Sequence, residues 1–257
     1  MGSSGDDGYR LLNEYANGFM VSQVLFAACE LGVFDLLAEA PGPLDVAAVA
    51  AGVEASSHGT ELLLDTCVSL KLLKVETRAG KAFYENTELS SAYLTRVSPT
   101  SQCSLLKYLG RTSYGCWGHL ADAVREGKNQ YLETFGVPAE DLFTAIYRSE
   151  GERLQFMRAL QDVWSVNGRS VLTAFDLSGF PRMCDLGGGG ILVIESLLDE
   201  DRRGPLLTQL YSLNMLVQTE GQERTPTHYH MLLSSAGFRD FQFKKTGAIY
   251  DAVLVRK

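Results

Sequence analysis

Residues 181–198, PRMCDLGGGGILVIESLL, decide how this chain of 257 residues can fold. An apolar strand is predicted to end at Asp185, and four glycines, 187–190, follow it almost at once. Such a run lets the backbone approach a ligand closely, as in the loop that binds a nucleotide-type cofactor. It is not a P-loop, which needs Gly-Lys-Ser/Thr, and the third glycine of a dinucleotide fingerprint would fall at Leu192. Taken alone, the run is equally typical of a flexible turn between two strands.

The residues after the glycines do not continue a cofactor-binding unit. Residues 191–194, Ile-Leu-Val-Ile, predict another strand, whereas parallel neighbours need a crossover of at least about ten residues. Farther on, Thr225-Pro226 predicts a helix that Gly237 ends, and two strands flank Thr246-Gly247. Residues 185–257 therefore make up about half of an open α/β cofactor domain. The deficit is on the order of 90 residues, and the break lies within the glycine run.

The first hundred residues predict a winged helix. Apolar side chains recur at helical spacing from Tyr9 to a stop at Gly32, helical segments follow at 44–52 and 58–73, and two strands flank Ala79-Gly80. Winged helices often bind DNA, but this span holds thirteen acidic and six basic residues, which is the wrong sign for phosphates. A scaffold or dimerisation domain is favoured.

The middle of the chain is expected to be mostly helical, with a helix start at Ser98-Pro99. Its aromatic side chains either line the pocket of an aromatic ligand or belong to the core, as most aromatics at helical spacing do. They are Tyr108, Trp117, Tyr147, Phe156 and Trp164. The predicted domains are then 1–100, a helical segment 101–180, and 181–257.

Composition narrows the classes of partner. With 31 acidic and 23 basic side chains the net charge is −8, which disfavours nucleic acid and anionic membrane surfaces. The longest apolar stretch, 19–29, is too short to span a bilayer, and the start of the chain has no secretory pattern, so a cytoplasmic protein is expected. No metal is expected, because His228 and His230 are two apart on a helix and point in different directions. Reduced thiols are expected at the five cysteines, Cys29, Cys67, Cys103, Cys116 and Cys184.

Four stretches carry a resemblance to a known family: NGFMVSQVLFAACELGVFDLL at 17–37, CDLGGG at 184–189, ILVIESLL at 191–198 and NMLVQTEGQERTPTHYHMLLSSAGF at 214–238. Together they resemble the dimeric O-methyltransferases that use S-adenosylmethionine, in particular the animal members that methylate N-acetylserotonin. The resemblance implies a mainly α winged-helix dimerisation domain followed by an α/β Rossmann-like methyltransferase domain, which is truncated here. It also implies a homodimer, or a heterodimer with a full-length relative, through the N-terminal helices.

The resemblance also assigns roles to residues. Tyr147 and Trp164 would contact the cofactor, while Asp185, Gly187 and Gly189 would form its loop. Asn214 and Gln218 would contact the indole substrate, and Glu195 and Glu223 would flank the catalytic histidine.

Other parts of the family site have no counterpart in this sequence. The family loop reads D-x-G-G-G-x-G, but Ile191 stands at the last glycine. The acid that holds the cofactor ribose, the Gly-Asp strand end near the adenine and the Leu-His-Asp-Trp motif with the catalytic base have no counterpart. The four histidines, His58, His119, His228 and His230, all lie outside the interval between the glycine loop and the later strand.

Two functions within this family remain open, an active O-methyltransferase and a shortened isoform without catalysis that still dimerises. Removing a proton from a phenol-like hydroxyl, whose pKa is near 10, needs a positioned base. The vacant base position and the missing ribose acid favour the second function, and the missing ribose and adenine contacts make cofactor binding doubtful. Glu195 and Glu223 are then expected to be two solvated surface acids.

Overall fold

The computed structural model describes residues 4–137, 142–179 and 190–256, and these form two compact units. Unit 1 consists of Met1–Thr112 with Leu154–Asp162, and unit 2 of Ser113–Arg153 with Val163–Lys257. The long helix α11, Glu150–Leu172, contributes to both units. The predicted domain bounds 1–100, 101–180 and 181–257 stay a prediction.

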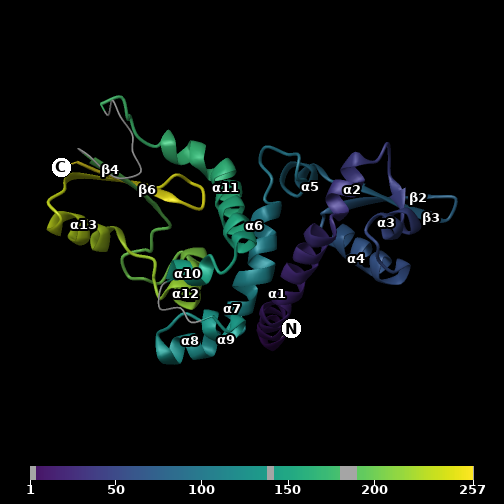
Figure 1. The fold of residues 1–257 in the computed structure, drawn as a ribbon, viewed down its shortest axis with the longest axis horizontal. Helices are drawn as coiled ribbons and strands as arrows, with labels where there is room; N and C mark the ends of the chain where they lie inside the picture. The colour runs from purple at the N-terminus through teal and green to yellow at the C-terminus, as the bar shows by residue number, and fades with distance from the viewer. Residues whose placement is uncertain (1–3, 138–141, 180–189, 257) are drawn as a thin grey trace. The chain divides into compact units, whose positions relative to one another are not determined.

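Unit 1 contains the predicted long N-terminal helix, the two further helices and the hairpin. Its elements are α1 Ser4–Leu31, α2 Val33–Glu39, β1 Leu44–Asp45, α3 Val46–Gly52, α4 Ser57–Ser69, β2 Leu73–Arg78, β3 Lys81–Asn86, α5 Glu88–Tyr93 and α6 Cys103–Tyr108. The sheet order is β1-β3-β2 with antiparallel pairs, and Figure 1 shows α2, α3 and α4 beside the hairpin. Sequence reasoning ended the first helix correctly at Gly32 but did not predict α2, which follows it.

Local signals explain where these elements begin and end. Gly32, with φ of 77°, separates α1 from α2, because this left-handed conformation suits glycine. Ala79 and Gly80, with φ of 48° and 78°, form the two-residue turn of the β2–β3 hairpin, as expected for a turn with two positive φ angles. Asp45 and Ser56 cap α3 and α4 by accepting hydrogen bonds from backbone N–H groups.

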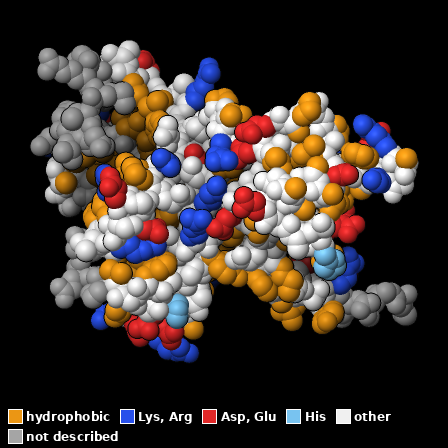
Figure 2. Space-filling model, turned by 45° about the vertical axis from the view of Figure 1, so that its right-hand side comes forward, with side chains coloured by type: hydrophobic (Ala, Val, Ile, Leu, Met, Phe, Trp, Pro, Cys, Tyr) orange, Lys and Arg blue, Asp and Glu red, His pale blue; other side chains and the backbone are white. Residues whose placement is uncertain are grey.

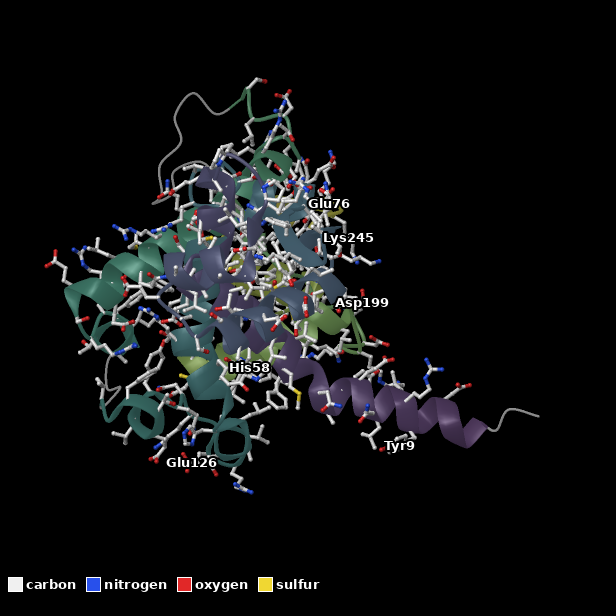
Figure 3. All side chains as sticks on the ribbon, turned by 90° about the vertical axis from the view of Figure 1, so that its right-hand side faces the viewer. Tyr9, His58, Glu76, Glu126, Asp199 and Lys245 are labelled. Atoms are coloured by element: carbon white, nitrogen blue, oxygen red, sulfur yellow. The ribbon has the colours of Figure 1, made fainter. Side chains whose placement is uncertain are left out.

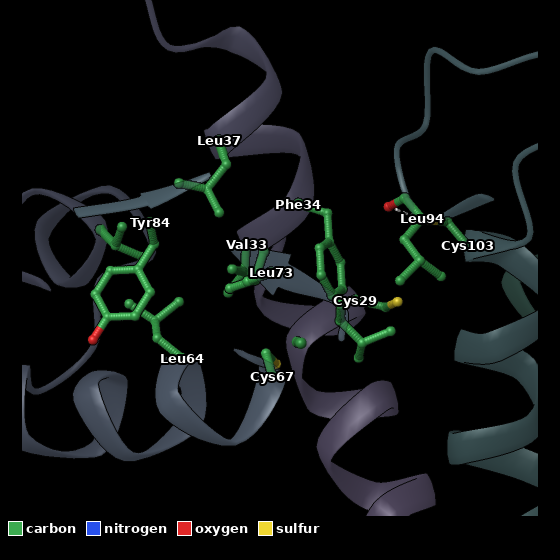
Figure 4. Close-up of a cluster of buried hydrophobic side chains, with 13 residues drawn as sticks. Cys29, Val33, Phe34, Leu37, Leu64, Cys67, Leu73, Tyr84, Leu94 and Cys103 are labelled. Atoms are coloured by element: carbon green, nitrogen blue, oxygen red, sulfur yellow. Dashed lines mark hydrogen bonds between the residues drawn. The ribbon is translucent and has the colours of Figure 1, made fainter. Parts of the chain in front are cut away.

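The core of unit 1 lies where α1, α2 and α4 meet the hairpin (Figure 4). Val33, Phe34 and Leu64 are almost fully buried there, and Tyr84 is buried with its hydroxyl donating to Asp65 at 2.7 Å. Asp35 is also buried and accepts hydrogen bonds from the backbone N–H and the Nε of Arg96, both at 2.7 Å. A buried carboxylate is tolerated because it is paired in this way.

Unit 2 is a set of helices with one small sheet. Its elements are a π-helix Leu109–Ser113 that crosses the unit boundary, α7 Tyr114–Trp117, α8 Leu120–Glu126, α9 Tyr131–Phe135, α10 Leu142–Ile146, the outer parts of α11, β4 Gly190–Glu195, α12 Leu206–Thr219, α13 Pro226–Ser235, β5 Arg239–Lys244 and β6 Asp251–Arg256. The sheet order is β4-β6-β5 and both pairings are antiparallel. The three predicted C-terminal strands and α13 are therefore confirmed.

The expected helix start at Ser98-Pro99 is wrong. Helix α6 begins only at Cys103, because the hydroxyls of Ser98 and Thr100 both donate to the carbonyl of Ala92 and hold the chain in a turn. Sequence reasoning also missed α9 and α12. Cys29, Cys67, Cys103 and Cys116 are buried free thiols, and Cys184 lies outside the described residues.

Within the described part of the chain, no single helix is long and apolar enough to cross a membrane. By length and composition alone one bent pair passes the same test, Asp7–Leu31 with Val33–Glu39 at an angle of 50°.

Candidate functional site

The two residues expected to contact an indole substrate, Asn214 and Gln218, lie one turn apart on α12 and are joined in a polar network. The indole Nε1 of Trp117 donates to Asn214 Oδ1 at 2.9 Å, and Gln218 Nε2 donates to the same oxygen at 2.7 Å. Gln218 Nε2 also lies 3.2 Å from Ser113 Oγ. Because Gln218 is buried, these bonds fix the amide groups of both side chains.

The two family carboxylates, Glu195 and Glu223, lie in one half-buried cluster. Glu195 ends β4, and Glu223 lies in the loop before α13, where its backbone N–H donates to Ser212 Oγ at 3.1 Å. Burial raises the pKa of both carboxyls, that of Glu223 to about 7, and the charge of Glu195 raises the pKa of Glu223 further. Arg224 acts in the opposite direction on both. The expectation of two solvated surface acids is wrong, because the loop after α12 folds back over the end of β4.

Three tyrosines surround this cluster, and burial raises the pKa of each hydroxyl. They are Tyr211, Tyr229 and Tyr250, with pKa values of about 12 for the last two. The charge of Glu223 contributes to the shift in all three cases. Among the groups that shift the pKa of Glu223, none is a histidine. Sequence reasoning missed Arg224 and the tyrosines, although Arg224 adjoins Glu223 in the quoted motif.

The residues expected to contact the cofactor are only partly described. Trp164 lies on α11 and is 45% exposed, with its ring close over Gly168 of the next turn, where an added Cβ would lie 2.6 Å from Trp164 Cε2. Tyr147 lies in the turn between α10 and α11, and its ring centroid is 5.6 Å from that of Phe143. Asp185, Gly187 and Gly189 lie outside the described residues.

The described residues do not build the cradle that a cofactor of this class needs. Gly190, the last of the four glycines, is already part of β4 and pairs with Arg256 of β6. The described sheet contains antiparallel pairs only, so within it no strand leads through a loop into a helix and on to a parallel strand. The described residues therefore form no crossover unit of a doubly wound domain, and the glycine loop at 185–189 lies outside them.

The two histidines of the expected helix lie on α13 and point to different sides. His228 lines a cavity beside Glu223, and the ring of His230 lies 4.2 Å from that of Phe241. In the described ranges, no group of three or more His, Cys, Asp or Glu side chains is placed to hold a metal ion.

Comparison with known proteins adds to this geometry. The family described as the O-methyltransferase dimerisation domain matches residues 13–96, and the O-methyltransferase domain matches residues 117–190 and 188–239. Acetylserotonin O-methyltransferase of Macaca mulatta is 72% identical and that of Homo sapiens 68% identical, each alignment covering all of both chains. The chain belongs to the acetylserotonin O-methyltransferase family. The resemblance inferred from the sequence motifs is confirmed, as is the order of a dimerisation domain and a methyltransferase domain.

The solved structures agree. The crystal structure of human N-acetylserotonin methyltransferase in complex with SAM superimposes with a TM-score of 0.96 at 68% identity, covering 100% of this chain and 99% of that chain. PigF with SAH, at 20% identity and a TM-score of 0.80, shares the fold over 96% of this chain.

The alignments with the macaque and human relatives each run over 345 positions, whereas this chain has 257 residues. The difference of 88 positions has no residue in this chain. The O-methyltransferase domain matches this chain in two segments, and these overlap at residues 188–190, within the glycine run.

Proposed function

We propose that this chain is a shortened member of the family that keeps the dimerisation domain and the substrate-side residues but does not transfer methyl groups. The observation that carries the proposal is a spacing in the sequence: the predicted strand end at Asp185 and the start of β4 at Gly190 are too close together to hold a crossover helix between them. The 88 aligned positions without a residue support it, because the predicted break and the change of matched segment both fall at 187–190.

The carboxylate cluster supports the loss of catalysis. Methyl transfer to the hydroxyl of an indole such as N-acetylserotonin requires a base that removes the hydroxyl proton while both reactants are aligned. In this chain Arg224 lowers the pKa of both Glu195 and Glu223, and among the described residues no hydrogen bond joins either carboxyl to a histidine. The network of Asn214, Gln218 and Trp117 survives and supports weak retention of an indole.

The surface of α1 supports association through the N-terminal helices, with a second copy or with a full-length relative in the cytoplasm. Large apolar side chains are exposed along this helix, which Figure 2 shows as a hydrophobic surface running toward the N-terminal residues. Tyr9, labelled in Figure 3, lies on the part of α1 that extends beyond the other elements of unit 1. The exposed set on α1 is Tyr9, Leu11, Leu12, Tyr15, Phe19, Met20, Val21 and Leu31. Exposed apolar side chains gathered along one helix are typical of a surface that contacts another protein.

Calorimetry and a turnover assay test the loss of function. We expect no saturable heat when S-adenosylmethionine at about 1 mM is added to the purified chain, which places any Kd in the millimolar range or above. We also expect no methylation of N-acetylserotonin above a control without enzyme. A full-length relative under the same conditions is the positive control. Low-micromolar cofactor binding or measurable turnover would instead support the active methyltransferase.

A further inference from the structure

One cavity of unit 2 lies on the opposite face of α12 from the substrate-side residues. Its volume is 510 Å³, and its walls come from the segment after β4, from α12, from the loop that follows α12 and from the first turn of α13. Residues of a helix follow one another at 100°, so Gln209, Leu213 and Leu216 share one face of α12, about half a turn away from Asn214 and Gln218. The cavity is therefore separate from the polar network around Trp117.

The cavity has the size and lining of a small-molecule site. Pockets that bind small ligands commonly hold about 300–1,000 Å³ and combine an apolar lining with a few polar groups. Leu198, Leu213 and Leu216 form the apolar part here, and Leu198 is buried. Ser212 and Gln209 add hydrogen-bonding groups, but the Ser212 hydroxyl already accepts from the backbone of Glu223.

Two guanidinium groups border the same cavity from different segments. Arg202 comes from the turn after β4, and within the described chain no carboxylate lies within ion-pair distance of it. Arg224 comes from the loop before α13; its Nη1 donates to the carbonyl of Gln222 at 3.3 Å, while its buried Nε has no hydrogen-bond partner among the described residues. Glu223 is the single acid among the lining residues. The lining therefore carries two guanidinium groups and one carboxyl, and Arg224 also lies near Glu195, which is outside the lining.

We propose that this cavity binds a small carboxylic acid with an apolar body, whose carboxylate pairs with Arg202 and Arg224 while its hydrocarbon part packs against the three leucines. Guanidinium groups bind carboxylates through two parallel hydrogen bonds, which makes them suited to such a ligand. A neutral amide of equal shape still offers an acceptor oxygen, but it lacks the negative charge that would pair with the two guanidinium groups.

The test compares a charged probe with its uncharged counterpart on the full 257-residue chain. The probes are 1-naphthylacetate and 1-naphthylacetamide, titrated by calorimetry at pH 7.5. We expect the carboxylate to bind about tenfold more tightly than the amide, a difference of about 1.4 kcal/mol. Arg202→Gln should reduce the affinity for the carboxylate by about fivefold and leave that for the amide unchanged, because it removes one charge without changing the apolar wall.

Two further variants separate this proposal from general effects of charge and folding. Arg239→Gln removes the same charge from exposed β5, outside the cavity, and should leave binding unchanged. Leu213→Trp fills the cavity and should weaken both probes. Arg202 is exposed, so its variant should keep the thermal midpoint of the wild type, which unfolding curves check. Equal affinities for the two probes, no binding of the carboxylate, or an unchanged Arg202→Gln variant would each overturn the proposal.

Discussion

Glu223 shows how one carboxyl can change character when the residues around it change. Its neighbours are Glu195, Arg224 and the hydroxyls of three tyrosines, and burial is the largest cause of its raised pKa. An orienting carboxylate in an enzyme must be ionised to hold a histidine in position. In this chain the carboxyl has a pKa of about 7 and so exchanges a proton near neutral pH.

This raised pKa predicts a dependence of stability on pH. The group is protonated in the folded chain and ionised in the unfolded chain between its ordinary value of 4.5 and about 7. The unfolded state then binds fewer protons, so the free energy of unfolding should fall as the pH rises through this window. Glu223→Gln should match the wild type near pH 4.5 and exceed it at pH 8 by about 1–2 kcal/mol, after allowance for solvent screening.

Urea unfolding from pH 4.5 to 8 checks this expectation. Glu126→Gln, on the exposed end of α8, is the control and should keep the pH dependence of the wild type (Figure 3). A Glu223→Gln variant that is less stable than the wild type at pH 8 would contradict the assignment, because it would mean that the ionised carboxylate is favourably paired.

At the scale of elements, the residues that start or end helices and form turns predicted the fold well. Gly32, the Ala79-Gly80 turn, the Thr225-Pro226 start and Gly237 all stand where the sequence placed them, because φ angles and N-caps are set by a few local atoms. Helix α12 escaped prediction because its N-cap, Pro205, makes no side-chain hydrogen bond and its left-handed C-cap is Glu220 and not a glycine, so the usual start and stop signals are absent there.

The candidate site was less predictable than the fold. Its residue types followed from motifs, but the burial of Glu195 and Glu223 depends on how a loop packs on a strand far from it in sequence. The predicted helix start at Ser98-Pro99 was wrong for a related reason. The hydroxyls of Ser98 and Thr100 donate to the carbonyl of Ala92 and do not cap a following helix.

The break between α1 and α2 gives a paired prediction on glycine. Gly32→Ala places a Cβ in open space but keeps φ at 77°, so the substitution acts only through backbone strain. We expect this strain to lower the free energy of unfolding by about 1–2 kcal/mol. Gly18→Ala, inside exposed α1 with nothing within 4 Å, should raise it by about 0.5–1 kcal/mol. Equilibrium unfolding in urea measures both, and the same sign of change for the two variants would show that φ at Gly32 is relaxed by movement of the chain.

At the scale of the whole molecule, the core of the dimerisation domain is built within unit 1. The domain matches its family over residues 13–96, and the described residues of the core among α1, α2, α4 and the hairpin all lie between Val24 and Leu106. Phe26, although apolar and on α1, packs within unit 1 close to Gly110, so its replacement would test folding and not association. Phe19 and Tyr15, 49% and 70% exposed, are the better probes of a partner surface.

Sedimentation of the full chain at tens of micromolar tests the association. We expect a dimer, and we expect Phe19→Asp to weaken it by at least about tenfold, because a buried unpaired carboxylate costs several kcal/mol. Val97→Asp, an equally apolar and 83% exposed position outside α1, should leave the dimer unchanged. A folded wild-type monomer at this concentration would end the partner-binding hypothesis.

The antiparallel sheet of unit 2 also has a consequence for the exchange of amide hydrogens with solvent. Strand β6 lies between two strands, whereas in the described sheet β4 has a partner on one side only. In an antiparallel pair, alternate backbone N–H groups point away from the partner. Every second amide of β4 should therefore exchange its hydrogen for deuterium faster than the amides of β6 do. A full-length relative in which a further strand covers β4 would label both strands slowly, so isotope uptake at Gly190–Glu195 distinguishes the two forms without any ligand.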